Sequence, residues 1–335
     1  MASRLKAKSS IVGGLLVGAA LLWLAFRDID FSRLAGIYAN VSLLVVVPVF
    51  FATAGEMFLR ALKWSILLEP SRPVRLWDAF RLEVSGMALN NVLPLRLGEI
   101  VRGTFGAGLF GIPVATVFAT LVAERALDTI VLGALFVIAA RLGGLGDALI
   151  RWGGCAGLLF AGLLTCLLVL VFIDEIMTHR SLGGLLRRFP RAAKGLGHLG
   201  MGIRAFHSFP TAAALVVLAV GQWLLNALNF YIVARAFGIS GVLDVSKCVV
   251  MIFGAAVASA VPGMPGYFGN FEFAIARMAG SWGVDKDVAF AYATCVHLFG
   301  YVFVTAAGML FVSQMGQSLG EVWERFRDRA ADDGR

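Results

Sequence analysis

Residues 83–128 read EVSGMALNNVLPLRLGEIVRGTFGAGLFGIPVATVFATLVAERALD, a stretch that sets charged side chains inside apolar sequence. Among its polar residues are Asn90, Asn91, Arg96, Glu99, Arg102, Glu124, Arg125 and Asp128, and Pro94 interrupts it. An ionisable group at membrane depth costs about 2.5–3.5 kcal/mol on insertion scales, so such groups face a protein interior or a water-filled cavity. The stretch is therefore the first candidate for a functional site.

A second stretch, residues 260–274, has the same order of features. It reads AVPGMPGYFGNFEFA, which is an apolar approach, a break of proline and glycine, and then Glu272. Irregular backbone at membrane depth is tolerated only where it is buried in protein or lines a cavity. We therefore predict a re-entrant helical hairpin around each break.

The composition is that of a multi-spanning membrane protein. The chain has 335 residues, of which 59% are hydrophobic and 15% charged, and its mean hydropathy is +0.84. A soluble domain carries about 25% charged residues. The net charge of +8 is therefore used to predict which segments face the cytoplasm. It does not indicate a nucleic-acid partner, and none is expected. The four cysteines have no metal spacing, and we expect no metal or other cofactor.

The apolar segments predict an all-α polytopic fold with six full spans and two re-entrant hairpins, eight apolar segments in all. A span needs about 20 apolar residues. The predicted spans are residues 10–26, 41–59, 114–140, 153–173, 211–237 and 288–313, and the predicted hairpins are residues 76–109 and 245–277. Hairpins that cross the membrane fully are the alternative.

The distribution of positive charge predicts the orientation. With a cytoplasmic N-terminus, the cytoplasmic segments hold 18 Lys and Arg residues and the outer segments hold 6. Such an excess is typical of cytoplasmic loops. We predict an inner-membrane protein with both termini in the cytoplasm, a basic cytoplasmic loop at residues 174–210 and a cytoplasmic tail at residues 314–335.

The order of segments occurs twice within a single membrane domain of residues 1–335. Residues 10–140 and residues 153–313 each predict span, span, hairpin and span, and Glu99 and Glu272 occupy corresponding places 173 residues apart. Three crossings per half give the two halves opposite orientations. Inverted repeats with broken elements are a transporter design, with the substrate at the interface between the repeats.

Three motifs together carry a family resemblance. They are Asn91-x-x-Pro94-x-Arg96-x-Gly98-Glu99-x-x-Arg102, Glu124-Arg125-x-x-Asp128 and Pro262-Gly263-x-x-Gly266-x-x-Gly269-x-x-Glu272. In combination they resemble the transmembrane region of lysylphosphatidylglycerol synthases, the flippase-like integral membrane family, over residues 10–315. The resemblance implies a membrane protein that handles lipids.

The chain departs from that family in two respects. The full synthases carry a soluble aminoacyl-transfer domain after the membrane part, whereas this chain ends at Arg335 without one, which argues against lipid aminoacylation. The glycine motif is also looser, with Met264 and Pro265 inside it, which leaves the headgroup open.

The charged residues allow functional and structural interpretations. Arg96, Glu99 and Arg102 lie at helical spacing, either as a guanidinium site for an anionic headgroup or as an internal pairing. Arg60, with its neighbours Glu56, Lys63 and Trp64, is either an interfacial anchor or a headgroup contact at the mouth of the site.

The acids allow similar alternatives. Glu124 and Asp128 share a helical face, so they need a cation nearby or a proton. We expect Glu272 to pair with Arg96, Arg102 or Arg125, or to carry a proton. His297 is expected to be a hydrogen-bonded structural residue, with a proton relay as the alternative. The polar residues that follow one side of the span at 211–237, namely Gln222, Asn226 and Asn229, are expected to link helices.

We predict a lipid transporter or flippase-like protein that moves or binds an anionic or polyprenyl-linked lipid. The expected substrate-binding residues are Arg60, Asn91, Arg96, Glu99, Arg102, Glu124, Arg125, Asp128 and Glu272. The alternative is a membrane-embedded lipid-modifying enzyme or an accessory subunit of lipid biosynthesis, although HExxH, P-loop and GxSxG motifs are all missing from the sequence. The partners considered are a membrane lipid, lipid-biosynthesis enzymes and a second copy of the chain.

Overall fold

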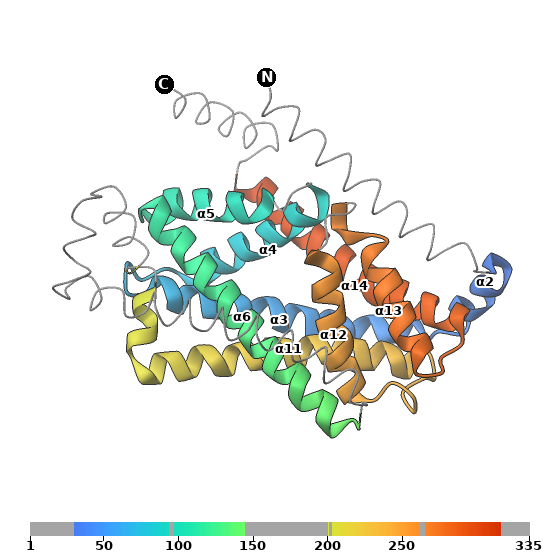
Figure 1. Ribbon diagram of the computed structural model, residues 1–335. Coiled ribbons are helices and arrows are strands. Elements are labelled where there is room, and N and C mark those ends of the chain that lie inside the picture. The colour runs from blue at the N-terminus through green and yellow to red at the C-terminus, as the bar shows by residue number, and fades with distance from the viewer. Residues whose placement is uncertain (1–29, 94–96, 145–199, 201–202, 261–264, 316–335) are drawn as a thin grey trace, which may run out of the picture.

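The computed structural model describes residues 30–93, 97–144, 200, 203–260 and 265–315. Regular structure within these ranges is helical throughout, without a strand, which confirms the predicted all-α class (Figure 1). The predicted spans at residues 10–26 and 153–173, the basic loop except for its last residues, and nearly all of the tail lie outside the described residues.

Apart from α3, the helices that correspond to predicted segments begin and end within a few residues of the predicted bounds. The helices of the described ranges are α2 (Phe31–Ala39), η1 (Leu43–Val45), α3 (Val46–Leu68), α4 (Leu76–Val92), α5 (Leu97–Phe110), α6 (Val114–Leu142), η3 (Arg204–His207), α11 (Phe209–Ala236), α12 (Val245–Ala260), η4 (Pro265–Tyr267), α13 (Asn270–Ser281) and α14 (Lys286–Gln314). Helix α2 was not predicted. The Asp30 side chain caps it by accepting hydrogen bonds from the backbone N–H groups of Ser32 and Arg33.

Three helical segments of the described chain are long and apolar enough to cross a membrane. They are Leu43–Leu68, Phe209–Ala236 and Lys286–Gln314. Helix α6 has 29 residues but carries charged residues at its middle. These helices fit a multi-pass membrane protein, while the predicted number of spans and the re-entrant course of the hairpins stay predictions.

Helix α3 corrects the interpretation of Arg60 as an interfacial anchor. The predicted span ended at Leu59, whereas α3 continues to Leu68 and buries Glu56, Arg60, Lys63 and Trp64. Carboxyl groups on neighbouring helices allow this burial, because they pair with the two cations inside the protein.

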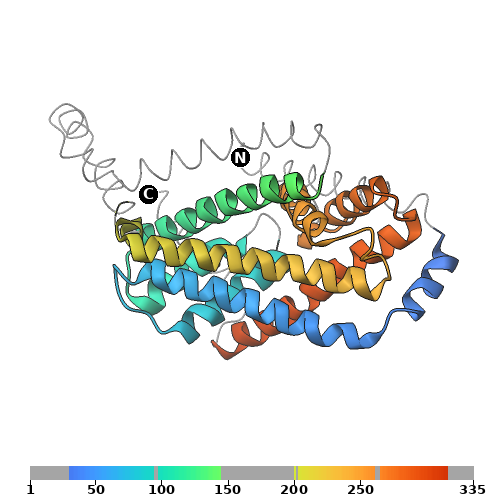
Figure 2. The ribbon, with the colours of Figure 1, turned by 90° about the horizontal axis from the view of Figure 1, so that it is seen from below.

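Helices α3 and α11 form an antiparallel central pair and lie side by side in both views (Figure 1 and Figure 2). Two glycines allow the close approach. A Cβ atom added at Gly55 would lie 3.2 Å from Cδ1 of Leu225, and one added at Gly221 would lie 3.1 Å from Cδ1 of Leu59. The contact is thus reciprocal, since each helix offers a glycine to a leucine of the other.

Two helical hairpins begin at opposite ends of this pair, since α4 follows the end of α3 and α12 follows the end of α11 (Figure 1). Helix α5 folds back on α4, with the backbone of Gly98 against that of Gly86. Helix α13 folds back on α12, where Nδ2 of Asn270 donates to the backbone oxygen of Ala258 at 3.2 Å.

The remaining contacts hold each hairpin against the long helices. Helix α4 packs against α14 and α3, and α12 packs against α6 and α11. Helix α5 also contacts α6, as α13 contacts α14. The largest apolar core lies among α6, α11, α12, α13 and α14. A cavity remains where the central pair meets both hairpins.

Candidate functional site

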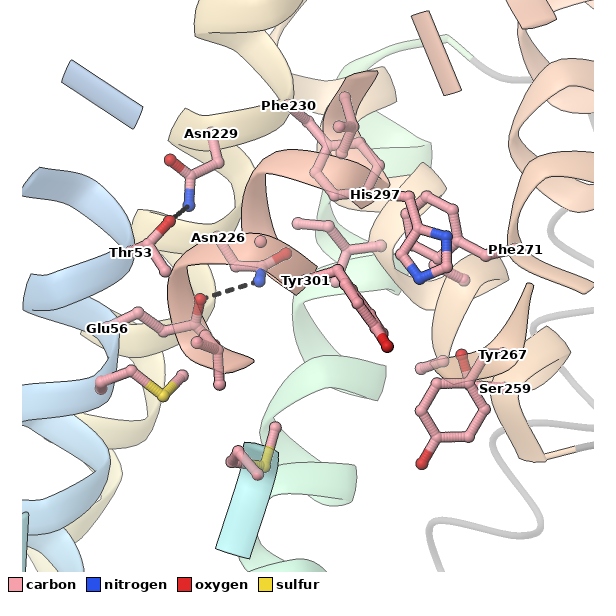
Figure 3. Close-up of a pocket in the computed structure, with 18 of the residues that line it drawn as sticks. Thr53, Glu56, Asn226, Asn229, Phe230, Ser259, Tyr267, Phe271, His297 and Tyr301 are labelled. Carbon is pink, nitrogen blue, oxygen red and sulfur yellow. Dashed lines mark hydrogen bonds between the residues drawn. The ribbon is translucent and has the colours of Figure 1, made fainter. Parts of the chain in front are cut away.

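A cavity of about 310 Å³ lies between the central helix pair and the two hairpins. Its wall takes residues from α3, α4, α6, α11, α12, η4, α13 and α14. Aromatic side chains from α11, η4, α13 and α14 surround its polar groups, as Figure 3 shows for Phe230, Tyr267, Phe271 and Tyr301. A partly polar, partly aromatic cavity inside an apolar helix assembly is the arrangement expected of a ligand site.

Amide side chains of α11 form one wall of the cavity. Asn226 donates from Nδ2 to Oε2 of Glu56 at 2.9 Å, and Asn229 donates to the hydroxyl oxygen of Thr53 at 3.2 Å (Figure 3). Deeper along the pair, Lys63 donates to Oε1 of Gln222 at 2.7 Å. All three bonds join α11 to α3, which confirms the expectation that Gln222, Asn226 and Asn229 link helices.

Behind this wall lies a buried charge network on α3, α4, α5 and α6. Its acids are Glu56, Glu83, Glu124 and Asp128, and its cations are Arg60, Lys63 and Arg102. Every member is at most 6% exposed. Four carboxyl groups against three cations would leave one negative charge if all were ionised.

Short ion-pair contacts between helices organise the network. Arg60 donates from Nε to Oε1 of Glu83 at 3.0 Å, and Arg102 donates from Nη2 to Oε2 of Glu124 at 2.7 Å. Lys63 forms a hydrogen-bonded ion pair with Asp128. Glu124 and Asp128 therefore have the cationic neighbours that their shared face requires, and they clasp α6 to α3 and α5.

Glu99 has a different partner from the one expected. Its carboxylate lies 3.3 Å from Nε of Arg125 on α6, and the two side chains are 33% and 36% exposed. Arg102, which helical spacing predicted as a partner of Glu99, instead forms ion pairs with Glu83 and Glu124. Arg96 lies outside the described residues. Arg125 itself lines the cavity.

Glu272 is paired with a histidine rather than with Arg102 or Arg125. Its Oε1 lies 2.6 Å from Nδ1 of His297 on α14, and its Oε2 accepts the backbone N–H of Gly269 at 2.7 Å. The His297 and Glu272 side chains are only 10% and 3% exposed. His297 is hydrogen-bonded, as expected, and it also lines the cavity.

The tip of the second hairpin has strained backbone beside the cavity. Gly266, Tyr267 and Gly269 all have positive φ, of 69°, 62° and 87°. Glycine adopts this region readily, but a bulky aromatic residue does not. Such strain persists only where surrounding structure enforces it, and it gathers at functional sites. Here it turns the Tyr267 ring to the cavity wall (Figure 3).

The predicted site residues within the described ranges thus divide into three groups. Arg60, Asn91 and Arg125 line the cavity, and Asn91 also donates to the hydroxyl of Thr305 at 2.9 Å. Glu99 and Glu272 pair with Arg125 and His297, which line the cavity. The remaining described candidates, Arg102, Glu124 and Asp128, belong to the buried network.

Several residues of the site were missed. Glu83 stands at the start of the opening stretch, yet nothing within one helical turn shows that it meets Arg60. Tyr267 and Tyr301 carry no charge and no spacing pattern. The signal that could have identified Tyr267 is its place between two glycines at a helix break.

Comparison with known proteins identifies relatives along nearly the whole chain. The model of the lysylphosphatidylglycerol synthase transmembrane region matches residues 11–308. A UPF0104 membrane protein of Methanothermobacter thermautotrophicus is 23% identical over 333 residues, 95% of this chain and 95% of the relative. Another, from Methanocaldococcus jannaschii, is 21% identical over 230 residues, 67% of this chain and 92% of the relative. No solved structure matches.

Proposed function

The chain belongs to the family of the lysylphosphatidylglycerol synthase transmembrane region, and from this premise we propose that it binds a membrane lipid by its headgroup in the central cavity and moves it across the inner membrane. The observation that carries the proposal is the cavity itself. Its lining combines polar side chains with aromatic and aliphatic ones, and it lies among helices that include three long and apolar enough to cross a membrane.

The size of the cavity supports a headgroup rather than a whole lipid. A volume of about 310 Å³ corresponds to roughly ten water molecules at about 30 Å³ each. A phosphate with a small polar substituent fills such a space, whereas acyl or polyprenyl chains do not enter it. The chains would remain in the bilayer while the headgroup passes between the hairpins.

The chemistry of the lining supports an anionic headgroup. Arg125 is about one third exposed and reaches the cavity, while its partner Glu99 lies beside it. A guanidinium offers a planar fork to phosphate. Asn91 and Asn226 supply neutral donors and acceptors, and Tyr301 supplies a hydroxyl and a ring face. An anionic phospholipid or a polyprenyl-phosphate-linked sugar matches this set.

The packing of the two halves supports movement rather than binding alone. Under the proposed repeat, α3 corresponds to α11, the first hairpin to the second, and α6 to α14. The contact of α4 with α14 then corresponds to the contact of α12 with α6. The contact of α4 with α3 corresponds to the contact of α12 with α11. The reciprocal contact of Gly55 with Leu225 and of Gly221 with Leu59 agrees with a two-fold relation across the central pair. Repeats of opposite orientation allow a site to open to either side in turn.

A lipid-movement assay with purified protein tests the proposal. Proteoliposomes would carry a panel of headgroup-labelled lipids, anionic, zwitterionic and polyprenyl-linked. We expect the label of at least one anionic lipid to change leaflet without chemical change, faster than in protein-free vesicles. A new lipid product would instead support the enzyme alternative, and unchanged leaflets across the panel would contradict transport.

A further inference from the structure

Two acid–base pairs occupy matched places in the two hairpins. Glu99 is the third residue of α5, and Glu272 is the third residue of α13. Their partners match as well, since Arg125 is the twelfth residue of α6 and His297 is the twelfth residue of α14. Both partners line the same cavity. The two pairs are thus counterparts, one at each hairpin.

The two pairs differ in one chemical respect. The guanidinium of Arg125 keeps its charge at every physiological pH, so its pair with Glu99 stays neutral overall. A histidine gains or loses its proton between about pH 5 and pH 8. When neutral His297 donates from Nδ1 to Glu272, the pair carries one negative charge. A proton added at Nε2 gives imidazolium and carboxylate, with no net charge.

The exposures of the two pairs differ in parallel. Glu99 and Arg125 are about one third exposed, whereas Glu272 and His297 are almost fully buried. The Arg125 pair is therefore more accessible to solvent than the His297 pair. A net charge at membrane depth is expensive unless it is paired or hydrated. With a proton on His297, the histidine pair has no net charge, like the pair of Arg125 and Glu99.

Aromatic rings pack around the imidazole of His297. Its ring stacks on Phe271 with centroids 4.5 Å apart, and the Phe268 ring lies at 4.7 Å. Aromatic faces attract cations. The titratable or charged groups around the pair are Tyr38 on α2, Tyr267 on η4, Cys295 and Tyr301 on α14, and Glu56, Arg60 and Arg125 across the cavity. The cations Arg60 and Arg125 are engaged by Glu83 and Glu99.

We propose that His297, held by Glu272, is the proton site of the transporter, and that one proton bound there removes the net charge of this buried pair beside the cavity. The inference rests on the proposed function, since it assigns the ion that would be coupled to lipid movement. Proton release leaves one net negative charge on the pair. The Arg125 pair is its fixed-charge counterpart.

Substitution of His297 tests the proposal through the pH profile of lipid movement. The wild type should change its rate several-fold between about pH 5 and pH 8. His297→Gln keeps a hydrogen-bonding side chain without a proton site, and His297→Arg copies the other half, so both should flatten the profile. His207→Gln, on exposed η3 away from the cavity, is the matched control and should keep the wild-type profile.

Glu56 is the rival proton site, since the buried network has one more acid than cations. A flat profile for Glu56→Gln together with a wild-type profile for His297→Gln would overturn the proposal. The NMR signal of the His297 ring, assigned by its loss in His297→Gln, gives a reading that does not need transport. It should move with pH, and a ring signal that does not respond to pH would refute the proposal. A wild type that moves no lipid would count against the proposed function, and the ring signal would then decide alone whether His297 takes up a proton.

Discussion

Nη2 of Arg102 donates a hydrogen bond of 2.7 Å to Oε2 of Glu124, and this contact ties α5 to α6 inside the protein. Under the proposed repeat, the corresponding positions of the second half are apolar. Ile275 stands three residues after Glu272, as Arg102 stands three after Glu99, and Val296 precedes His297 as Glu124 precedes Arg125. Ile275 and Val296 belong to the largest apolar core. Matched positions thus hold one hairpin by ion pairs and the other by apolar packing.

The first prediction concerns the removal of Arg102. Arg102→Ala leaves Glu83 and Glu124 short of a cation in a buried environment, which should cost about 3–5 kcal/mol of unfolding free energy. Arg125→Ala is the control, because its pair with Glu99 is one third exposed and should contribute about 0–1 kcal/mol. Denaturant unfolding in detergent measures both, and equal losses would contradict the difference in burial.

The second prediction copies the apolar half into the charged half. Arg102→Ile combined with Glu124→Val removes both partners and fills the space with apolar groups. Replacement of a buried ion pair in this way is often neutral, whereas removal of one partner is not. The double variant should therefore unfold at a higher temperature than Arg102→Ala. A double variant less stable than the single one would show that the network tolerates no apolar substitute.

The third prediction concerns the strained hairpin tip. In Gly266→Ala, the added Cβ would lie 2.6 Å from Cε2 of Tyr301, and φ is 69°. We expect a loss of about 1–3 kcal/mol in stability and reduced lipid movement, because Tyr267 would leave the cavity wall. Gly36→Ala, on exposed helix α2 with nothing within 4 Å, should be neutral or stabilising. Unchanged melting of Gly266→Ala would refute the strained geometry.

The fourth prediction tests the guanidinium in the cavity. Arg125→Lys keeps the charge but loses the planar fork, so movement of an anionic lipid should slow several-fold while the melting temperature stays close to that of the wild type. Arg235→Lys, at an exposed position near the end of α11, is the matched control. Normal transport by Arg125→Lys would exclude a bidentate phosphate contact at this residue.

The fifth prediction concerns orientation in the membrane. In a background without accessible native cysteines, Asn40→Cys and Ser281→Cys should react with an impermeant reagent added outside the cell, and Ser71→Cys should react only after lysis. All three positions are exposed, so burial does not decide the result. The reverse pattern would overturn the cytoplasmic placement of both termini.

The sequence by itself determined the helices and the breaks between them. Apolar runs and the Pro/Gly breaks placed α4, α5, α6 and α12 within a few residues of their observed bounds. These features are local, since helix propensity and the loss of a backbone donor at proline act within a few residues. The same locality placed Glu99 and Glu272 just after the breaks.

The tertiary structure alone decided which charges meet. Helical spacing predicted Arg102 as the partner of Glu99. In the structure Glu99 pairs with Arg125, and Glu272 pairs with His297. A potential ion-pair partner one helical turn away competes with the charged side chains of every helix that packs alongside. Buried charges need short, well-directed contacts to offset desolvation, and the packing of α4, α5 and α6 against α3, and of α13 against α14, supplies them. That packing depends on contacts far apart in the chain, which no spacing within one segment encodes.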